Sequence, residues 1–191
     1  MKKPWFEPHL TSLLSDRIDT LNNWRSQVPT LSGQTKNFET WLLVELVDRV
    51  SRSDNIRDLR TNGNLVGKKI RASEVFGLSG SKAKAVHLSP DISVRLKINN
   101  SVISAEIKTG LAPNEILNDL KIVQHYKKIG ICNQAEFAWV VLLPNGDSES
   151  RSSTKSFEKI FQRIQDDNPA LSFFRNAITP WMSLVVAVTP E

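Results

Sequence analysis

The segment from Phe137 to Leu143 is an almost unbroken apolar run that ends at Pro144-Asn145-Gly146, a sequence typical of turns. A short run without polar alternation is typical of a strand that is buried on both faces of a sheet. A second apolar stretch, from Trp181 to Val188, predicts another buried strand. A sheet with two covered faces needs helices to cover it, so the chain is expected to fold as α/β.

Four segments carry apolar residues at the three- and four-residue spacing of amphipathic helices. These segments are residues 7–28, 35–52, 113–128 and 157–164. Residues 92–98 instead alternate between apolar and polar, as a half-buried strand does. After the turn at Asn99-Asn100, residues 102–108 predict the returning strand of a hairpin.

The segment between the second helix and the hairpin, residues 53–85, is polar and contains several turn-forming residues. It predicts a short strand near residues 65–70 or 72–76, and a loop from Gly77 onward. Residues 147–154 are Ser-rich and are also expected to form a loop.

No change of composition and no linker divides the 191 residues, so we expect one domain with a mixed sheet flanked by helices. In this interpretation residues 1–34 are an N-terminal helical extension and residues 35–191 form the core.

Composition excludes several kinds of site. The single cysteine, Cys132, rules out an internal disulfide and a Cys-rich zinc site, and no HExxH motif is present. The formal net charge of +5 favours a polyanion as partner. The N-terminus lacks the apolar segment of a secretion signal, and no apolar run is long enough to cross a membrane. We therefore expect a cytoplasmic protein that binds no membrane.

Glu39 is an acidic residue within the apolar face of the helix predicted for residues 35–52. At about 100° per residue, Leu46 and Val50 project within about 20° of it. A carboxylate buried there needs a cation, a metal or a proton, because an unpaired buried charge is costly. The alternative is that Glu39 lies at a frayed helix start and faces water.

The predicted hairpin brings polar residues of its two strands together. Asp91 opens the first strand, and Glu106 and Lys108 share one face of the second. The turn at Asn99-Asn100 sets a register in which Asp91 lies close to the level of Glu106 and Lys108. Two converging carboxylates repel each other unless a divalent cation bridges them, and Mg²⁺ takes one or two carboxylates together with waters and phosphates. A nearby lysine can orient or deprotonate a metal-bound water and stabilise charge on a phosphate.

Pro90-Asp91, followed after fourteen residues by Glu106-Ile107-Lys108, resembles the motif of the PD-(D/E)xK nucleases. This superfamily includes restriction endonucleases, Holliday-junction resolvases and phage-defence nucleases. The resemblance implies a restriction-endonuclease-like core of order αβββαβ. It also implies Asp91 and Glu106 as metal ligands, Lys108 as the catalytic lysine, and Mg²⁺ as cofactor, for which Mn²⁺ can substitute.

Two further residues are similar to residues of that superfamily. Glu39 resembles a glutamate that many members carry on the first core helix, which makes it a candidate catalytic residue and third metal ligand. Gln124 resembles a catalytic glutamine that some members carry on the helix after the ExK strand, although its spacing differs from theirs.

Basic residues concentrate in residues 49–84, a segment that contains nine Lys or Arg residues and only three acidic residues. A basic surface beside the hairpin would fit DNA phosphates, and a solvated loop is the alternative. The candidate DNA-binding residues are Lys68, Lys69, Arg71, Lys82 and Lys84.

These residues lead us to expect a Mg²⁺-dependent endonuclease that hydrolyses DNA phosphodiester bonds in restriction or phage defence. Cutting both strands of a duplex normally takes two active sites, so a homodimer or a partner subunit is expected. Two alternatives remain. One is a nuclease-like module that binds nucleic acid or another subunit without cutting, and the other is an ordinary hairpin with exposed surface charges.

Overall fold

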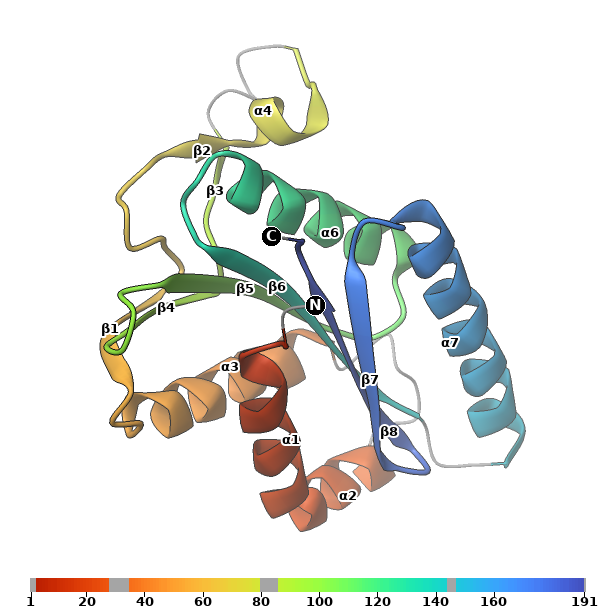
Figure 1. The fold of residues 1–191 in the computed structure, drawn as a ribbon. Helices are drawn as coiled ribbons and strands as arrows, with labels where there is room; N and C mark the ends of the chain where they lie inside the picture. Colours follow the sequence, from red (N-terminus) through yellow and green to blue (C-terminus); the bar gives the residue numbers. More distant parts are fainter. Residues whose placement is uncertain (1–2, 28–34, 80–85, 144–146, 191) are drawn as a thin grey trace.

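The computed structural model describes residues 3–27, 35–79, 86–143 and 147–190. Six strands of these residues form the main sheet: β1 (Ile56–Thr61), β4 (Ile92–Leu96), β5 (Val102–Thr109), β6 (Gln134–Leu142), β7 (Ser172–Thr179) and β8 (Met182–Val188). They lie in the order β1-β4-β5-β6-β8-β7 (Figure 1). β6 runs parallel to β5 and every other neighbouring pair is antiparallel, which confirms a mixed sheet.

Helices cover both faces of this sheet (Figure 1). One face carries α1 (Phe6–Asp16), α2 (Ile18–Gln27) and α3 (Thr35–Ser51), and the other carries α6 (Pro113–Lys128) and α7 (Asp147–Asp167). The prediction of a mixed α/β fold with a helix-flanked sheet is therefore confirmed.

A small excursion, which we call the arm, lies between β1 and β4 and comprises residues 62–79 and 86–90. It contains the short strands β2 (Ile70–Arg71) and β3 (His87–Leu88), which pair with each other, and the helix α4 (Ala72–Phe76). Figure 1 shows the arm beyond the end of α6 that leads into β6. Ile70 of β2 is fully buried in the same apolar cluster as α6, so the arm is anchored at its base.

The central strand β6 is buried along its whole length, as its apolar sequence predicted. Ala138, Val140 and Leu142 face the core beneath α1 and α3. Phe137, Trp139 and Val141 face the core beneath α6 and α7. The two cores explain why this strand lacks polar alternation, since neither of its faces reaches water.

From α3 onward the elements follow the order helix, three antiparallel strands, helix, parallel strand: α3, β1, β4, β5, α6 and β6. The arm is inserted between the first two strands. Because parallel neighbours need a long crossover, α6 has to pass over the sheet between β5 and β6. This crossover places one side of α6 over the carboxyl end of β5.

Several sequence-based expectations differ from the structure. The single helix expected over residues 7–28 is two helices, because the backbone of Arg17 leaves helical geometry at φ −108° and ψ 17°. The loop expected at residues 147–154 is the beginning of α7. Residues 72–76, one of the two places considered for a short strand, form α4 instead.

The edge strands β1 and β7 were not predicted. In β1 a bulge between Ile56 and Asp58 breaks the pairing register, so its partly buried residues Ile56 and Leu59 are three positions apart instead of two. β7 also has a register shift, and its residues are only partly covered. In both strands the alternation that marks a strand in sequence is lost. No helix among the described residues is long and apolar enough to cross a membrane.

Candidate active site

Asp91 and Glu106 lie side by side at the carboxyl end of β5. The β4–β5 pairing aligns Ile92 with Ala105, so the next residues, Asp91 and Glu106, are level with each other. The Asp91 carboxylate accepts a hydrogen bond from the backbone N–H of Ile107 at 2.8 Å. The sequence predicts Asp91 close to the level of both Glu106 and Lys108, and the observed pairing puts it beside Glu106.

The pKa values of both carboxyl groups are raised. Burial raises the pKa of Asp91 above its usual value, although the Ile107 N–H and a hydrogen bond from Glu106 oppose the shift. Burial and the neighbouring Asp91 charge raise the pKa of Glu106 much further. Glu106 is therefore the protonated partner and Asp91 the acceptor, as expected when two carboxyl groups meet at one point without a cation.

Tyr126 of α6 holds Glu106 from the other side. Its hydroxyl donates a hydrogen bond to Glu106 Oε1 at 2.5 Å. Burial and the nearby Glu106 carboxyl raise the pKa of this phenol, which keeps it protonated and a hydrogen-bond donor. Tyr126 fixes the orientation of the Glu106 side chain.

Lys108 lies on the same face of β5 and is surrounded by acidic groups. Its Nζ is 2.9 Å from Glu115 Oε2 on α6 and 3.7 Å from Glu39 Oε2 on α3. Burial by itself would lower the pKa of Lys108, but the Glu115 hydrogen bond and the Glu39 charge raise it. The lysine is therefore an ammonium ion at neutral pH.

Glu39 lies beside the buried stripe of α3 and not within it. The stripe consists of Phe38, Leu42, Leu46 and Val50. The Glu39 side chain is 31% exposed, and its carboxylate accepts a hydrogen bond from the Thr109 N–H at 3.2 Å. Burial raises its pKa, while Lys108 and Thr109 oppose the shift. Of the two alternatives for Glu39, the structure supports the paired carboxylate.

Asp119 of α6 is an acidic neighbour that sequence reasoning missed, as it missed Glu115. Burial raises the pKa of Asp119 to about 7; Lys108 opposes the shift, and the charges of Asp91, Glu39 and Glu115 add to it. Glu115, Asp119 and Tyr126 are spaced i, i+4 and i+11 on α6, which puts them on one side of the helix. This spacing is the signal in the sequence that could have revealed them.

The oxygen donors here suit a hard divalent cation better than a transition metal. Among the described residues, no group of three or more His, Cys, Asp or Glu side chains is placed to hold a metal ion. Mg²⁺ needs only one or two carboxylates, because water fills its remaining positions. Asp91 and Glu106 could supply that pair, since metal binding would displace the proton that they share.

Gln124 is not brought to this group. Its Nε2 donates a hydrogen bond to Asn168 Oδ1 at 2.8 Å, on another side of α6. Gln124 follows Asp119 by five residues, which turns it about 140° away around the helix. Tyr126, two residues later, takes the inward position.

The candidate DNA-binding residues of the arm are exposed. Lys68, Lys69 and Arg71 lie at β2, and Lys68 Nζ donates a hydrogen bond to the Ile129 carbonyl at the end of α6, at 3.1 Å. Lys82 and Lys84 fall outside the described residues.

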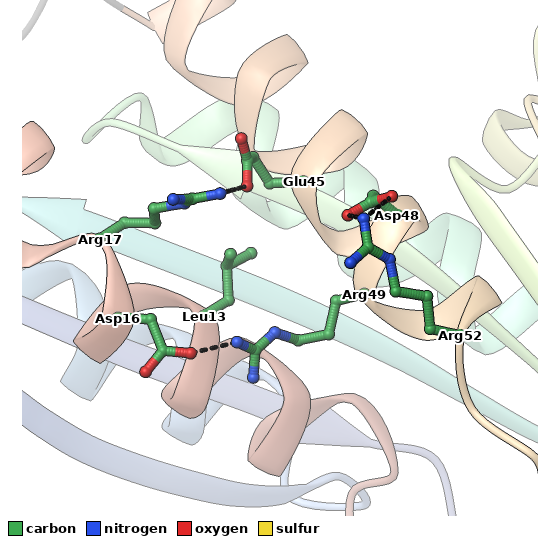
Figure 2. Close-up of a pocket in the computed structure, with 7 residues that line it drawn as sticks. All are labelled: Leu13, Asp16, Arg17, Glu45, Asp48, Arg49 and Arg52. Carbon is green, nitrogen blue, oxygen red and sulfur yellow. Dashed lines mark hydrogen bonds and ion pairs between the residues drawn. The ribbon is translucent and has the colours of Figure 1, made fainter.

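A separate pocket between α1 and α3 is lined by opposite charges that pair with one another (Figure 2). Arg17 pairs with Glu45 at 2.9 Å, Arg52 with Asp48 at 2.7 Å, and Arg49 with Asp16. Glu45 therefore pairs with Arg17 of the neighbouring helix, although its spacing of four residues from Arg49 also allows a pair within α3. Arg17 and Arg49 join the two helices, whereas Arg52 pairs with Asp48 four residues before it. Every charge that lines the pocket is therefore paired, so this pocket is a poor candidate for chemistry.

The chain matches no protein-family model, and comparisons with curated proteins and with solved structures also give no match. The interpretation of the site therefore depends on its own geometry and chemistry.

Proposed function

We propose that this protein is a Mg²⁺-dependent endonuclease that hydrolyses phosphodiester bonds in DNA. The observation that carries the proposal is the convergence of Asp91 and Glu106 on one point. Lys108 lies two residues after Glu106, on the same face of β5. The order α3, β1, β4, β5, α6 and β6 is also similar to the αβββαβ core of the PD-(D/E)xK nucleases. A role in restriction or phage defence is part of the proposal.

In this proposal Asp91 and Glu106 hold the cation. Glu39 pairs with Lys108 and so offsets part of the lysine's positive charge. When bound, Mg²⁺ would polarise the scissile phosphate and lower the pKa of a water molecule. Tyr126 keeps the Glu106 carboxylate turned towards Asp91. The shared proton leaves when the cation arrives, so cation binding should weaken at low pH.

Lys108 then acts through its charge. Because its pKa is raised, the ammonium group cannot accept a proton from water at neutral pH. It can instead pair with a phosphate oxygen as negative charge develops there, in exchange for its pairing with Glu115. In the reaction, water oxygen bonds to phosphorus, the bond from phosphorus to the leaving sugar oxygen breaks, and that oxygen takes up a proton.

The test is plasmid cleavage with Mg²⁺, with Mn²⁺ and with EDTA, using the wild type and Asp91→Ala. We expect nicked or linear product with either metal, none with EDTA, and none from the variant. A wild type that binds DNA and never cuts it with either metal would favour the non-cleaving binding module. Sedimentation with and without a DNA duplex tests the expected homodimer.

A further inference from the structure

The outward side of α6 forms a basic groove, on the opposite side of the helix from the candidate active site. At about 100° per residue, Lys121, His125 and Lys128 project about 180–240° away from Asp119. The groove has a volume of about 440 Å³, and its far wall is formed by residues that follow α7 and β8, including Leu171 and Thr189.

Positive charge dominates this groove. The described residues that line it include Lys121, Lys127, Lys128 and His125, and none of them is acidic. The arm adds Lys68, whose ammonium group reaches the Ile129 carbonyl at the end of α6. Burial lowers the pKa of His125; Glu74 of α4 opposes this shift, and the positive charges of Lys128 and Lys68 add to it. The groove therefore has a local excess of positive charge.

His125 lines the groove, but its Nε2 is buried and has no hydrogen-bond partner among the described residues. A buried atom cannot meet a ligand in the open groove, so the lysines are the groups that a ligand would contact.

Neutralising the helix dipole explains only part of this arrangement. Lys127 and Lys128 lie in the last turn of α6, where cations stabilise a helix, and Lys127 Nζ also donates to the Asn133 carbonyl at 2.8 Å. Lys121 is about two turns earlier and gains nothing from the helix end. Lys121 and Lys128 are about 10 Å apart along the axis, at 1.5 Å per residue.

We propose that this groove binds backbone phosphates of duplex DNA, as a contact surface separate from the candidate active site. A DNA strand carries about one negative charge per 3.4 Å along the duplex axis. The separation of about 10 Å between Lys121 and Lys128 therefore matches several consecutive phosphates and exceeds the size of a single small anion. The groove would hold a part of the duplex that is not cut. The choice of DNA rests on the proposed function, whereas the charge of the groove does not.

The test is the salt dependence of binding to a fluorescein-labelled 20-base-pair duplex, followed by fluorescence anisotropy in EDTA between 50 and 200 mM salt. The variant is Lys121→Glu with Lys128→Glu. The control is Lys155→Glu with Lys159→Glu, two exposed lysines of α7 that lie outside the groove. Both pairs change the net charge equally, so a general electrostatic effect would be the same for both.

We expect the groove variant to lose about tenfold or more in affinity and the slope of log K against log salt to become shallower by about 1.8, which is 0.9 for each of two phosphate contacts. The control should keep the wild-type slope. Equal losses in the two variants, an unchanged slope in the groove variant, or no binding by the wild type would each overturn the proposal.

Because EDTA prevents cleavage, this result is independent of catalysis. If the wild type cuts DNA and the groove variant binds DNA normally, the proposal for the groove is refuted and the proposed function stands. A wild type that never cuts, together with a groove variant that has lost binding, would support the groove and refute the nuclease.

Discussion

Glu136 offers a prediction about stability whose size follows from the structure. This carboxyl group is fully buried at the beginning of β6. It accepts hydrogen bonds from the backbone N–H groups of Trp5 at 2.6 Å and Phe6 at 3.0 Å, and from the Gln134 amide. It thereby satisfies N–H groups at the start of α1 and fastens that helix to the sheet.

Burial raises the pKa of Glu136 from 4.5 to about 7, even though the three donors favour its ionised form. A pKa that is higher in the folded state means that folding takes up a proton. The contribution of Glu136 to stability is then complete below about pH 4.5 and is lost as the pH rises through about 7. The shift of about 2.5 pKa units corresponds to about 3 kcal/mol at 1.36 kcal/mol per unit.

We predict that Glu136→Gln removes this part of the pH dependence, because the amide is neutral at every pH. The free energy of unfolding, measured in urea from pH 4.5 to 8.5, should fall with pH by about 3 kcal/mol more in the wild type than in the variant. Any constant loss from the changed hydrogen bonds cancels in this comparison. Asp19→Asn, an exposed acid in the first turn of α2, is the matched control. Parallel curves for the wild type and Glu136→Gln would refute the reasoning.

Three further predictions concern the candidate active site and the arm. Tyr126→Phe should slow metal-dependent cleavage by about tenfold and leave DNA affinity unchanged, since it removes only the hydrogen bond that orients Glu106; an unchanged single-turnover rate would contradict this. Asp91→Ala and Glu106→Ala should each abolish cleavage, since each removes one of the two carboxyl groups that would hold the cation; full activity in either variant would contradict the assignment. Lys69→Glu with Arg71→Glu should flatten the salt dependence of DNA binding by about 1.8 if both side chains contact phosphates, and an unchanged slope would place the DNA elsewhere.

The hairpin was predictable because its signals are local. Alternation over residues 92–98 fixes which side chains share a face, and the Asn99-Asn100 turn limits the register. Together these predict that Asp91 lies close to the level of Glu106 and Lys108, and the pairing of β4 with β5 decides in favour of Glu106. For Glu39 the helical spacing predicts a place within the apolar face of α3, and the structure puts it beside the buried stripe, where it pairs with Lys108.

The contribution of α6 was not predictable in the same way. Local periodicity predicts that residues 113–128 form a helix, but the path of the crossover decides which side of it lies over β5. That path turns Asp119 and Tyr126 inward and directs Gln124 to Asn168. The bulge in β1 concealed that strand for a related reason, because the alternation of its side chains depends on its pairing with β4.

The most direct test of the proposed nuclease is Lys108→Ala, compared with the wild type and with Lys97→Ala, an exposed lysine near the hairpin turn. The single-turnover rate of DNA cleavage should be measured with saturating Mg²⁺, and the DNA dissociation constant with EDTA. We predict that Lys108→Ala slows cleavage by about 10²–10³ with little change in affinity, because it removes a preorganised charge at the reacting phosphate. Lys97→Ala should cut like the wild type. Normal cleavage by Lys108→Ala, or a wild type that cuts no DNA with Mg²⁺ or Mn²⁺, would contradict the proposed function.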